Sequence, residues 1–520
     1  MNEPGLALNG LLAIPLGFAV LSALTARRPS DHLALGLAVL GSLVTLGWSV
    51  WVAFSAGGFV VDVAWIESMG VRWHLGADGI SAPLIVMTTL ITACCLVSLV
   101  KHAPSCGGRV TLAILLLVIE TGSLGCFLAL DMVLFFVFFE VALIPMWFVI
   151  NSWGDAADEP GRRRAATRFL IFTVLGSALM LVGFLLVRSM TGTFDIVEIA
   201  AGRASYDFDS STALLASFLV GLGLAVKTPL WPLHIWLPDA HSKAPTVGSV
   251  LLAAVLLKLG TYGFIRFWMP VTDAAWEQFV PLVAALAVVG IVYGALACLA
   301  QTDLKRLIAY SSVGHMGFVV LAVTTFTIGG VQAAVYASVA HGLITGLLFF
   351  VAGAIKDRYG TAELAQLRVL YGRVPRLAAV FAFAVMAGLG LPGLAGFWGE
   401  MLAIRSAVDP SGALPGNTFA VLAVLAGFGV ILTTAYFLAL MRGMLQGAPL
   451  EVRPVNPGTE SVELESAEVD PGSRRVDTDM HALEWLAWSP LIALTLVLGV
   501  APGLLLTPVS DATRVFLGGL

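Results

Sequence analysis

Apolar stretches of about 20 residues follow one another along the whole 520-residue sequence. A helix of that length crosses the hydrocarbon core of a bilayer and satisfies its backbone hydrogen-bonding groups internally. The strands of a transmembrane barrel would instead be segments of about ten residues that alternate between polar and apolar side chains, and no such repeated alternation is present. The sequence therefore predicts an all-α integral membrane protein.

The composition agrees with this class. Hydrophobic residues make up 58% of the chain and charged residues only 12%, which is unlike the composition of soluble domains. The net charge of −5 gives no sign of nucleic-acid binding. We therefore expect a lipid bilayer, and no nucleic acid, around this chain.

Five cysteines are present, and none belongs to a C-x-x-C pair of the kind that binds iron–sulfur clusters or zinc. A Rossmann fingerprint, which needs a glycine-rich turn between a strand and a helix of a βαβ unit, is also absent. We therefore predict no metal and no cofactor in this chain and interpret the cysteines as helix-packing residues. They are Cys94, Cys95, Cys106, Cys126 and Cys298.

We predict about fourteen membrane spans from the positions of the apolar stretches. The first is expected to be a retained helix, because the residues before it lack the basic segment of a signal peptide. The spans cover residues 6–25, 32–54, 80–100, 110–129, 132–150, 167–188, 212–231, 246–268, 278–299, 305–325, 330–355, 377–404, 416–445 and 484–508.

Lysine and arginine residues collect on one side of this arrangement. If the N-terminus lies outside, and residues at span ends are counted with the adjoining loop, 20 of the 28 basic residues, Lys305 among them, fall in cytoplasmic segments. Six fall outside, and two, Lys227 and Lys258, lie within spans. Basic residues gather in cytoplasmic loops, so both termini are predicted to lie outside. A missed or additional span would destroy this asymmetry, and the count therefore also supports fourteen spans.

Five charged side chains lie at membrane depth in the predicted spans, away from the basic residues at the span ends, and there each costs roughly 2.5 to 3.5 kcal/mol to insert. They are Glu120, Glu140, Lys227, Lys258 and Glu400. Such residues need a partner, a water-filled cavity or a function. The structural alternative is that Glu140 and Lys227 form a neutral pair that holds two helices together, while the others lie near helix ends. The central position of Glu120, Glu140 and Lys258 favours a function.

Two of these charges lie beside proline and glycine. Lys227 precedes Pro229 and Pro232, and Glu400 follows the segment GLGLPG at 388–393. Proline removes a backbone donor and clashes with the preceding turn, so spans 7 and 12 should be broken. Broken spans at corresponding places in two halves indicate an inverted-repeat transporter. The two five-helix repeats would be spans 4–8 and 9–13.

The long polar segment at 447–483 is rich in aspartate and glutamate, and its composition predicts a disordered cytoplasmic linker. A regulatory role is the alternative. The expected organisation is therefore N-terminal helices 1–3 at 1–104, the first repeat at 105–270, the second repeat at 271–446, the linker at 447–483 and helix 14 at 484–520.

Two histidines can connect the charges. His315 lies on span 10 and His341 on span 11, each with a hydroxyl-bearing residue one turn away. Helix packing is the alternative for both. A bis-histidine haem site is a further alternative, but it leaves the buried lysines and Glu400 unexplained. His234 and His241 lie next to the predicted break in span 7, where we expect a structural role.

Several long segments around these charges are similar in sequence to a known protein family. They are AVKTPLWPLHIWLPDAH at 225–241, KAPT at 243–246, LLKLGTYGFIR at 256–266, DLKRLIAYSSVGHMG at 303–317 and LPGLAGFWGEM at 391–401. Together they resemble the antiporter-like membrane subunits of bacterial proton-pumping NADH:quinone oxidoreductase, respiratory complex I. Related subunits usually carry lysine where this chain has Glu400, so the acid points to the subunit M group.

The resemblance implies a proton relay. In such subunits the glutamate of span 5 pairs with the lysine of span 7, and the lysine of span 8 is linked through histidines to the acid of span 12. The corresponding residues here are Glu140, Lys227, Lys258, His315, His341 and Glu400, with Glu120 as a further buried acid. The expected proton path runs from Lys227 to Lys258, then through His315 and His341, and leaves outward from Glu400.

The resemblance also implies partners and a location. NADH oxidation and quinone reduction would take place in other subunits, which would hold FMN, iron–sulfur clusters and quinone. The neighbours would be other complex I membrane subunits, with antiporter-like subunits on both sides, in the inner (plasma) membrane of a bacterial cell. The alternative is a subunit of a multisubunit cation/proton antiporter.

Overall fold

The computed structural model describes residues 3–26, 31–55, 58–102, 106–202, 205–206, 211–272, 279–367, 370–446 and 479–518. Most of the predicted acidic linker, residues 447–478, lies outside the described residues. Within the described part the chain is almost entirely helical, as predicted.

Twelve of the described helical segments are long and apolar enough to cross a membrane. They are α1 (Glu3–Thr25), α2 (Asp31–Phe54), α3 (Ala82–Leu99), α4 (Arg109–Leu128), α5 (Met132–Trp153), α6 (Glu159–Thr191), the composite span Thr246–Val271, α12 (Val280–Leu299), α13 (Leu304–Val323), α14 (Ile328–Tyr359), α18 (Gly416–Leu445) and α19 (Ala482–Val500).

The composite span changes its helical type several times. It consists of α10 (Thr246–Leu251), the π-helical segment η3 (Leu252–Leu256), α11 (Leu257–Gly263), the π-helical segment η4 (Phe264–Trp268) and the short 3₁₀ turn η5 (Met269–Val271). π-Helical turns are rare and occur often at functional sites. The sequence analysis predicted one span here, and it did not foresee the π-helical turns.

The two remaining predicted spans are broken, as expected. In span 7, the helix α8 (Ser211–Lys227) ends at Lys227, and the chain forms turns before the short helix α9 (Trp236–Lys243). The second consists of α16 (Pro375–Gly388) and α17 (Ala395–Val408). The turn between them contains Gly390 and Gly393, whose φ values of 80° and 92° favour glycine. With the twelve long spans, these two account for the fourteen predicted spans.

Other features of the fold were not predicted. The antiparallel strands β1 (Phe59–Ile66) and β2 (Val71–Ala77), joined by the turn η1 (Glu67–Met69), form a hairpin between α2 and α3. The last predicted span, 484–508, is wrong at its end: α19 stops at Val500, and a separate helix, α20 (Gly503–Gly518), begins after Pro502. Proline there interrupts the helical hydrogen bonds. The short helices α7 (Ile196–Gly202) and α15 (Leu370–Arg373) complete the described elements.

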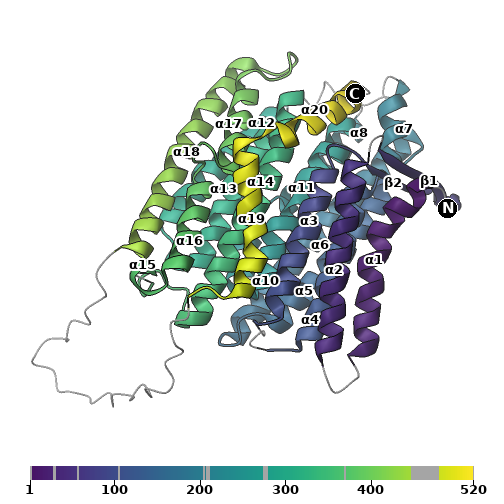
Figure 1. Cartoon of the computed structure of the whole chain (residues 1–520). Helices are drawn as coiled ribbons and strands as arrows, with labels where there is room; N and C mark the ends of the chain where they lie inside the picture. The colour runs from purple at the N-terminus through teal and green to yellow at the C-terminus, as the bar shows by residue number, and fades with distance from the viewer. Residues whose placement is uncertain are drawn as a thin grey trace, which may run out of the picture.

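The long helices run roughly side by side, and the two ends of the chain lie toward the same end of the bundle (Figure 1). The hairpin and α20 share that end. Gly79, just after β2, packs so closely on α20 that a Cβ atom there would lie 2.0 Å from the carbonyl oxygen of Pro508. An even number of spans requires this arrangement of the termini. The division into two inverted repeats stays a prediction.

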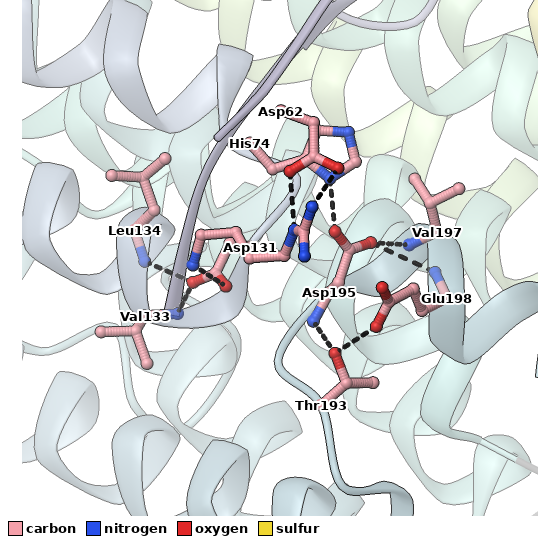
Figure 2. Close-up of polar contacts among 10 residues, drawn as sticks. Asp62, His74, Asp131, Val133, Leu134, Thr193, Asp195, Val197 and Glu198 are labelled. Carbon is pink, nitrogen blue, oxygen red and sulfur yellow. Dashed lines mark hydrogen bonds and ion pairs between the residues drawn. The ribbon is translucent and has the colours of Figure 1, made fainter. Parts of the chain in front are cut away.

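Two buried aspartates attach the hairpin to the helices (Figure 2). Asp131 caps the start of α5 through the backbone N–H groups of Val133 and Leu134, and it also accepts a hydrogen bond from the N–H of Arg72 in β2. Asp195 caps α7 and lies 2.5 Å from Nδ1 of His74 in β2. Because capping aspartates satisfy free N–H groups at helix starts, these contacts order the end of the bundle that holds both termini.

Candidate functional site

Lys258 lies between the two π-helical segments and is fully buried, with 0% of its surface exposed. Ala253 belongs to η3, and the Lys258 ammonium donates a hydrogen bond to its carbonyl group at 2.7 Å. A backbone carbonyl of the irregular segment is thus a polar partner of the buried ammonium. The local structure positions the ammonium in the centre of the molecule.

A line of contacts leads from Lys258 to Glu400. Nζ of Lys258 lies 2.6 Å from Nδ1 of His341 on α14. The ring of His341 meets the ring of His315 on α13 edge to face, with centroids 5.6 Å apart. Nδ1 of His315 lies 2.9 Å from Oε1 of Glu400 on α17. Four of the predicted site residues therefore lie next to one another, on four different segments of the chain.

The order of the two histidines differs from the expected one. The sequence analysis followed the chain and placed His315 next to Lys258, whereas His341 makes that contact and His315 contacts Glu400. The physical reason is that α13 and α14 are neighbouring helices that lie side by side (Figure 1). Their positions in the bundle, and not their order in the chain, decide which histidine faces the lysine.

The break in span 12 positions Glu400. Gly390 lies in the turn and approaches the carboxylate so closely that a Cβ atom there would lie 3.3 Å from Oε2. Beside the carboxylate is a small cavity of about 30 Å³, which both histidines also line. A cavity of this size with several polar groups can hold a water molecule. Proton transfer between the two imidazoles, which are not hydrogen-bonded to each other, therefore has room for a bridging water.

The predicted Glu140–Lys227 ion pair is not formed. Lys227 is buried at the end of α8, and its ammonium lies over the rings of Phe139 and Phe169, 4.8 and 5.8 Å from their centroids. In the described part of the chain, neither the Lys227 ammonium nor Oε1 of Glu140 has a hydrogen-bond partner. The two charges interact electrostatically without contact. Cation–π contacts with aromatic faces replace the expected carboxylate, so a neutral structural pair does not explain these residues.

Glu120 stands apart from the line of contacts. It is fully buried on α4, and neither of its carboxylate oxygens has a hydrogen-bond partner among the described residues. No hydrogen bond or ion pair joins it to the other six predicted site residues in that part of the chain. The structure therefore confirms its burial but does not connect it with Lys258 or Lys227.

Two further buried groups have features that the sequence analysis missed. His241 on α9 is fully buried, stacks on Phe349 at 4.5 Å, and has no hydrogen-bond partner at either ring nitrogen. Lys305 was counted among the cytoplasmic loop charges, yet only 4% of its surface is exposed, and it donates a hydrogen bond to the carbonyl group of Ala244 at 3.0 Å. The segment DLKRLIAYSSVGHMG contains Lys305, so the resemblance carried a signal for it.

The geometry does not favour the haem alternative. Both histidines use Nδ1 for contacts with Lys258 or Glu400, and the space beside their rings is the cavity of about 30 Å³. A haem macrocycle, which would have to lie between two axial ligands, does not fit into such a space.

Asp62, His74 and Asp195 place ligand-type atoms within 4.8 Å of one another (Figure 2), a spacing that suits a metal ion. All three side chains already have partners in the structure. Asp62 pairs with Arg72 at 2.6 Å, and His74 contacts Asp195, which caps α7. These structural contacts account for the cluster, and the expectation of a chain without metal stays a prediction.

Comparison with known proteins places the chain in a family. The transmembrane family described as NADH:quinone oxidoreductase/Mrp antiporter matches residues 129–429. NADH-quinone oxidoreductase subunit M of Rhodobacter capsulatus is 40% identical over 463 residues, which cover 86% of this chain and 82% of that protein.

Solved structures agree. A chain of respiratory complex I from Thermus thermophilus superimposes with a TM-score of 0.83, at 29% identity and with all of both chains covered. A chain of the Mrp complex from Dietzia sp. has a TM-score of 0.82 at 23% identity, covering 100% of this chain and 99% of that one, and shows the shared fold. On the family match and the 40% identity, the chain belongs to the subunit M family of NADH-quinone oxidoreductases.

Proposed function

We propose that this chain translocates protons across the membrane as a subunit of an NADH:quinone oxidoreductase. The observation that supports this most strongly is the line of contacts from Lys258 through His341 and His315 to Glu400. Each of these four groups can bind and release a proton, and all lie in the interior of a membrane protein. Ionisable groups placed there mark proton or ion pathways.

The steps follow from the contacts. The Lys258 ammonium gives a proton to Nδ1 of a neutral His341 at 2.6 Å. The imidazolium that results releases a proton from its other nitrogen, through water in the small cavity, to His315. His315 then passes a proton from Nδ1 to the Glu400 carboxylate at 2.9 Å. Each transfer uses one group as donor and the next as acceptor, so the charge moves without an isolated ion in lipid.

Glu140 and Lys227 can control the start of this path. Because Lys227 has no hydrogen-bond partner in the described structure, a small movement that brought Glu140 into contact would stabilise its protonated form. Loss of that contact would favour proton release toward Lys258. The pair would then act as a switch, and the cation–π arrangement would be its open state.

Energy for pumping would come from the rest of the complex. NADH oxidation and quinone reduction would occur in partner subunits that hold FMN, iron–sulfur clusters and quinone. This chain would lie in the bacterial inner membrane between antiporter-like neighbours, with both termini outside. Glu400 would release protons toward that outer side.

A cation/proton antiporter subunit is the second candidate, because the matching family also includes Mrp antiporters and the Mrp structure has the same fold. Proton transport measured with and without sodium separates the two functions. A sodium requirement would favour the antiporter, and sodium-independent pumping driven by NADH would favour the oxidoreductase.

Glu400→Gln tests the proposed function. The amide keeps a polar group beside His315 but cannot carry a proton, so the assembled complex should pump poorly. Infrared difference spectra during turnover should contain a protonated-carboxyl band that the variant lacks. Glu363→Gln, at an exposed glutamate, is the matched control and should pump normally. Full pumping by Glu400→Gln, with an unchanged spectrum, would remove Glu400 from the path.

A further inference from the structure

A large cavity is lined by residues at one end of the bundle. The helix ends that supply this lining lie opposite the end that holds the termini (Figure 1). The cavity has a volume of about 670 Å³, and it lies among the ends of α3, α5, α14 and α19 and the connection between α9 and α10. The lining includes both basic and acidic side chains, such as Lys101, Asp155, Lys356 and Glu484. A polar cavity of this size holds water.

Lys305 differs from the other basic residues of this cavity. Lys356 pairs with Asp155 at 3.1 Å and remains partly exposed. Lys305 is buried, and its one hydrogen bond in the described structure is to the carbonyl group of Ala244. No salt bridge neutralises it among the described residues. A buried ammonium without a carboxylate partner is costly unless the group can lose its proton.

His241 belongs to the segment that Lys305 contacts. Ala244, which accepts the hydrogen bond from Lys305, follows His241 by three residues, at the end of α9. The His241 ring stacks on Phe349 of α14, the helix that also carries His341. Positive charges on Lys305 and Lys258 oppose a proton on this ring, so His241 can take up a proton only while Lys258 is neutral. Neither ring nitrogen of His241 has a hydrogen-bond partner among the described residues. A buried imidazole with two free nitrogens, held in place by the stack on Phe349, is suited to bind a proton from one side and release it on the other.

We propose that the cavity, Lys305 and His241 form a second proton uptake path, which delivers protons to Lys258 without passing Lys227. This inference rests on the proposed function, because it adds a source to the same relay. Under the predicted topology the cavity faces the cytoplasm, which is the side from which pumped protons must come.

The proton balance is simple. A neutral Lys305 amine takes a proton from a hydronium ion in the cavity and leaves water behind. The ammonium gives a proton to one His241 nitrogen, and the other nitrogen releases one to the neutral Lys258 amine. Lys305 and His241 then return to their neutral forms. No oxidant, reductant or cofactor takes part.

Three variants test this path in the assembled complex, reconstituted in vesicles. Lys305→Met keeps the length of the side chain and removes the proton-binding group, and His241→Phe keeps the stack on Phe349. Lys243→Met is the matched control: it removes a lysine two residues from His241 that pairs with Asp158 at 2.7 Å and does not line the cavity. NADH-driven acidification and quinone-linked NADH oxidation are measured together with assembly on native gels.

We expect Lys305→Met and His241→Phe each to assemble and to slow pumping by about twofold or more, because only the path through Lys227 then delivers protons, with Lys243→Met unchanged. Lys305→His should recover part of the rate, because imidazole also exchanges protons, whereas a merely structural lysine would not be rescued. Lys258→Met in the same preparation separates the outcomes. If it loses pumping while Lys305→Met and His241→Phe pump normally, the relay stands and the second path is refuted. If Lys258→Met also pumps normally, the proposed function itself fails.

Discussion

Lys258→Met separates a structural lysine from one that carries protons. Methionine has a similar length and no charge, so it fills the same buried position between η3 and η4. A lysine that held the helices together would destabilise the protein when removed. A lysine that relays protons would leave stability intact and abolish transfer.

The structure gives the size of the expected stability change. Removing the ammonium loses the hydrogen bond to Ala253, and a bond from a charged donor contributes about 1.5–3 kcal/mol. Against this, burying an ion costs several kcal/mol, and no salt bridge offsets that cost at Lys258 in the described part of the chain. Replacement of buried charges by apolar side chains of similar volume is often neutral or stabilising by about 1–4 kcal/mol. We therefore expect the variant to be as stable as the parent, or more stable.

The effect on transport should be large. Without Lys258, His341 has no proton donor at its Nδ1 atom, and loss of a positioned acid or base slows a proton transfer by about 100-fold or more. NADH oxidation coupled to pumping should fall, or fewer protons should be pumped for each NADH. Thermal unfolding of the purified complex and dye-detected acidification of vesicles measure the two effects. Normal pumping by an assembled Lys258→Met complex would refute the relay.

Three other changes test separate parts of the argument. Lys227→Met should assemble and pump at a reduced rate, because it removes the group at the start of the first path and leaves the proposed path through Lys305 and His241; normal vesicle acidification would exclude Lys227 from the relay. Deletion of residues 456–476 should leave assembly and pumping intact on native gels and in vesicles, since the acidic composition offers few side chains for a core; lost assembly would reveal a docking segment. Glu484→Gln should lower the free energy of unfolding by about 3 kcal/mol, because it breaks a buried two-point ion pair with Arg358 at 2.7 and 3.0 Å. The control is Glu159→Gln, which breaks an exposed ion pair with Arg163 and should lower the free energy of unfolding by less than about 1 kcal/mol. Equal melting curves for the two variants would contradict the reasoning.

Local chemistry made much of this fold predictable from the sequence. Apolar length places the spans, because a helix must match the thickness of the bilayer. Proline and glycine beside Lys227 and Glu400 place the two breaks, because they act on the backbone within one turn. The same reasoning missed the hairpin β1–β2. Its strand β2 is held by Asp131 and Asp195 at the starts of α5 and α7, and such long-range contacts cannot be predicted from a local sequence pattern. This reasoning also extended the last span past Pro502.

Tertiary structure alone decided how the site is connected. Lys258 and His341 are 83 positions apart, and His315 and Glu400 are 85 apart, so only the packing of α11, α13, α14 and α17 brings each pair into contact. The sequence indicated the burial of Glu120, Lys227, Lys258 and Glu400, because the cost of a charge in lipid depends on the span around it. It could not determine which aromatic faces would replace Glu140 beside Lys227. The sequence also could not show that Lys305 is buried beside a cavity, because its position at the start of a span resembles that of a loop residue. Burial there depends on neighbours from distant helices.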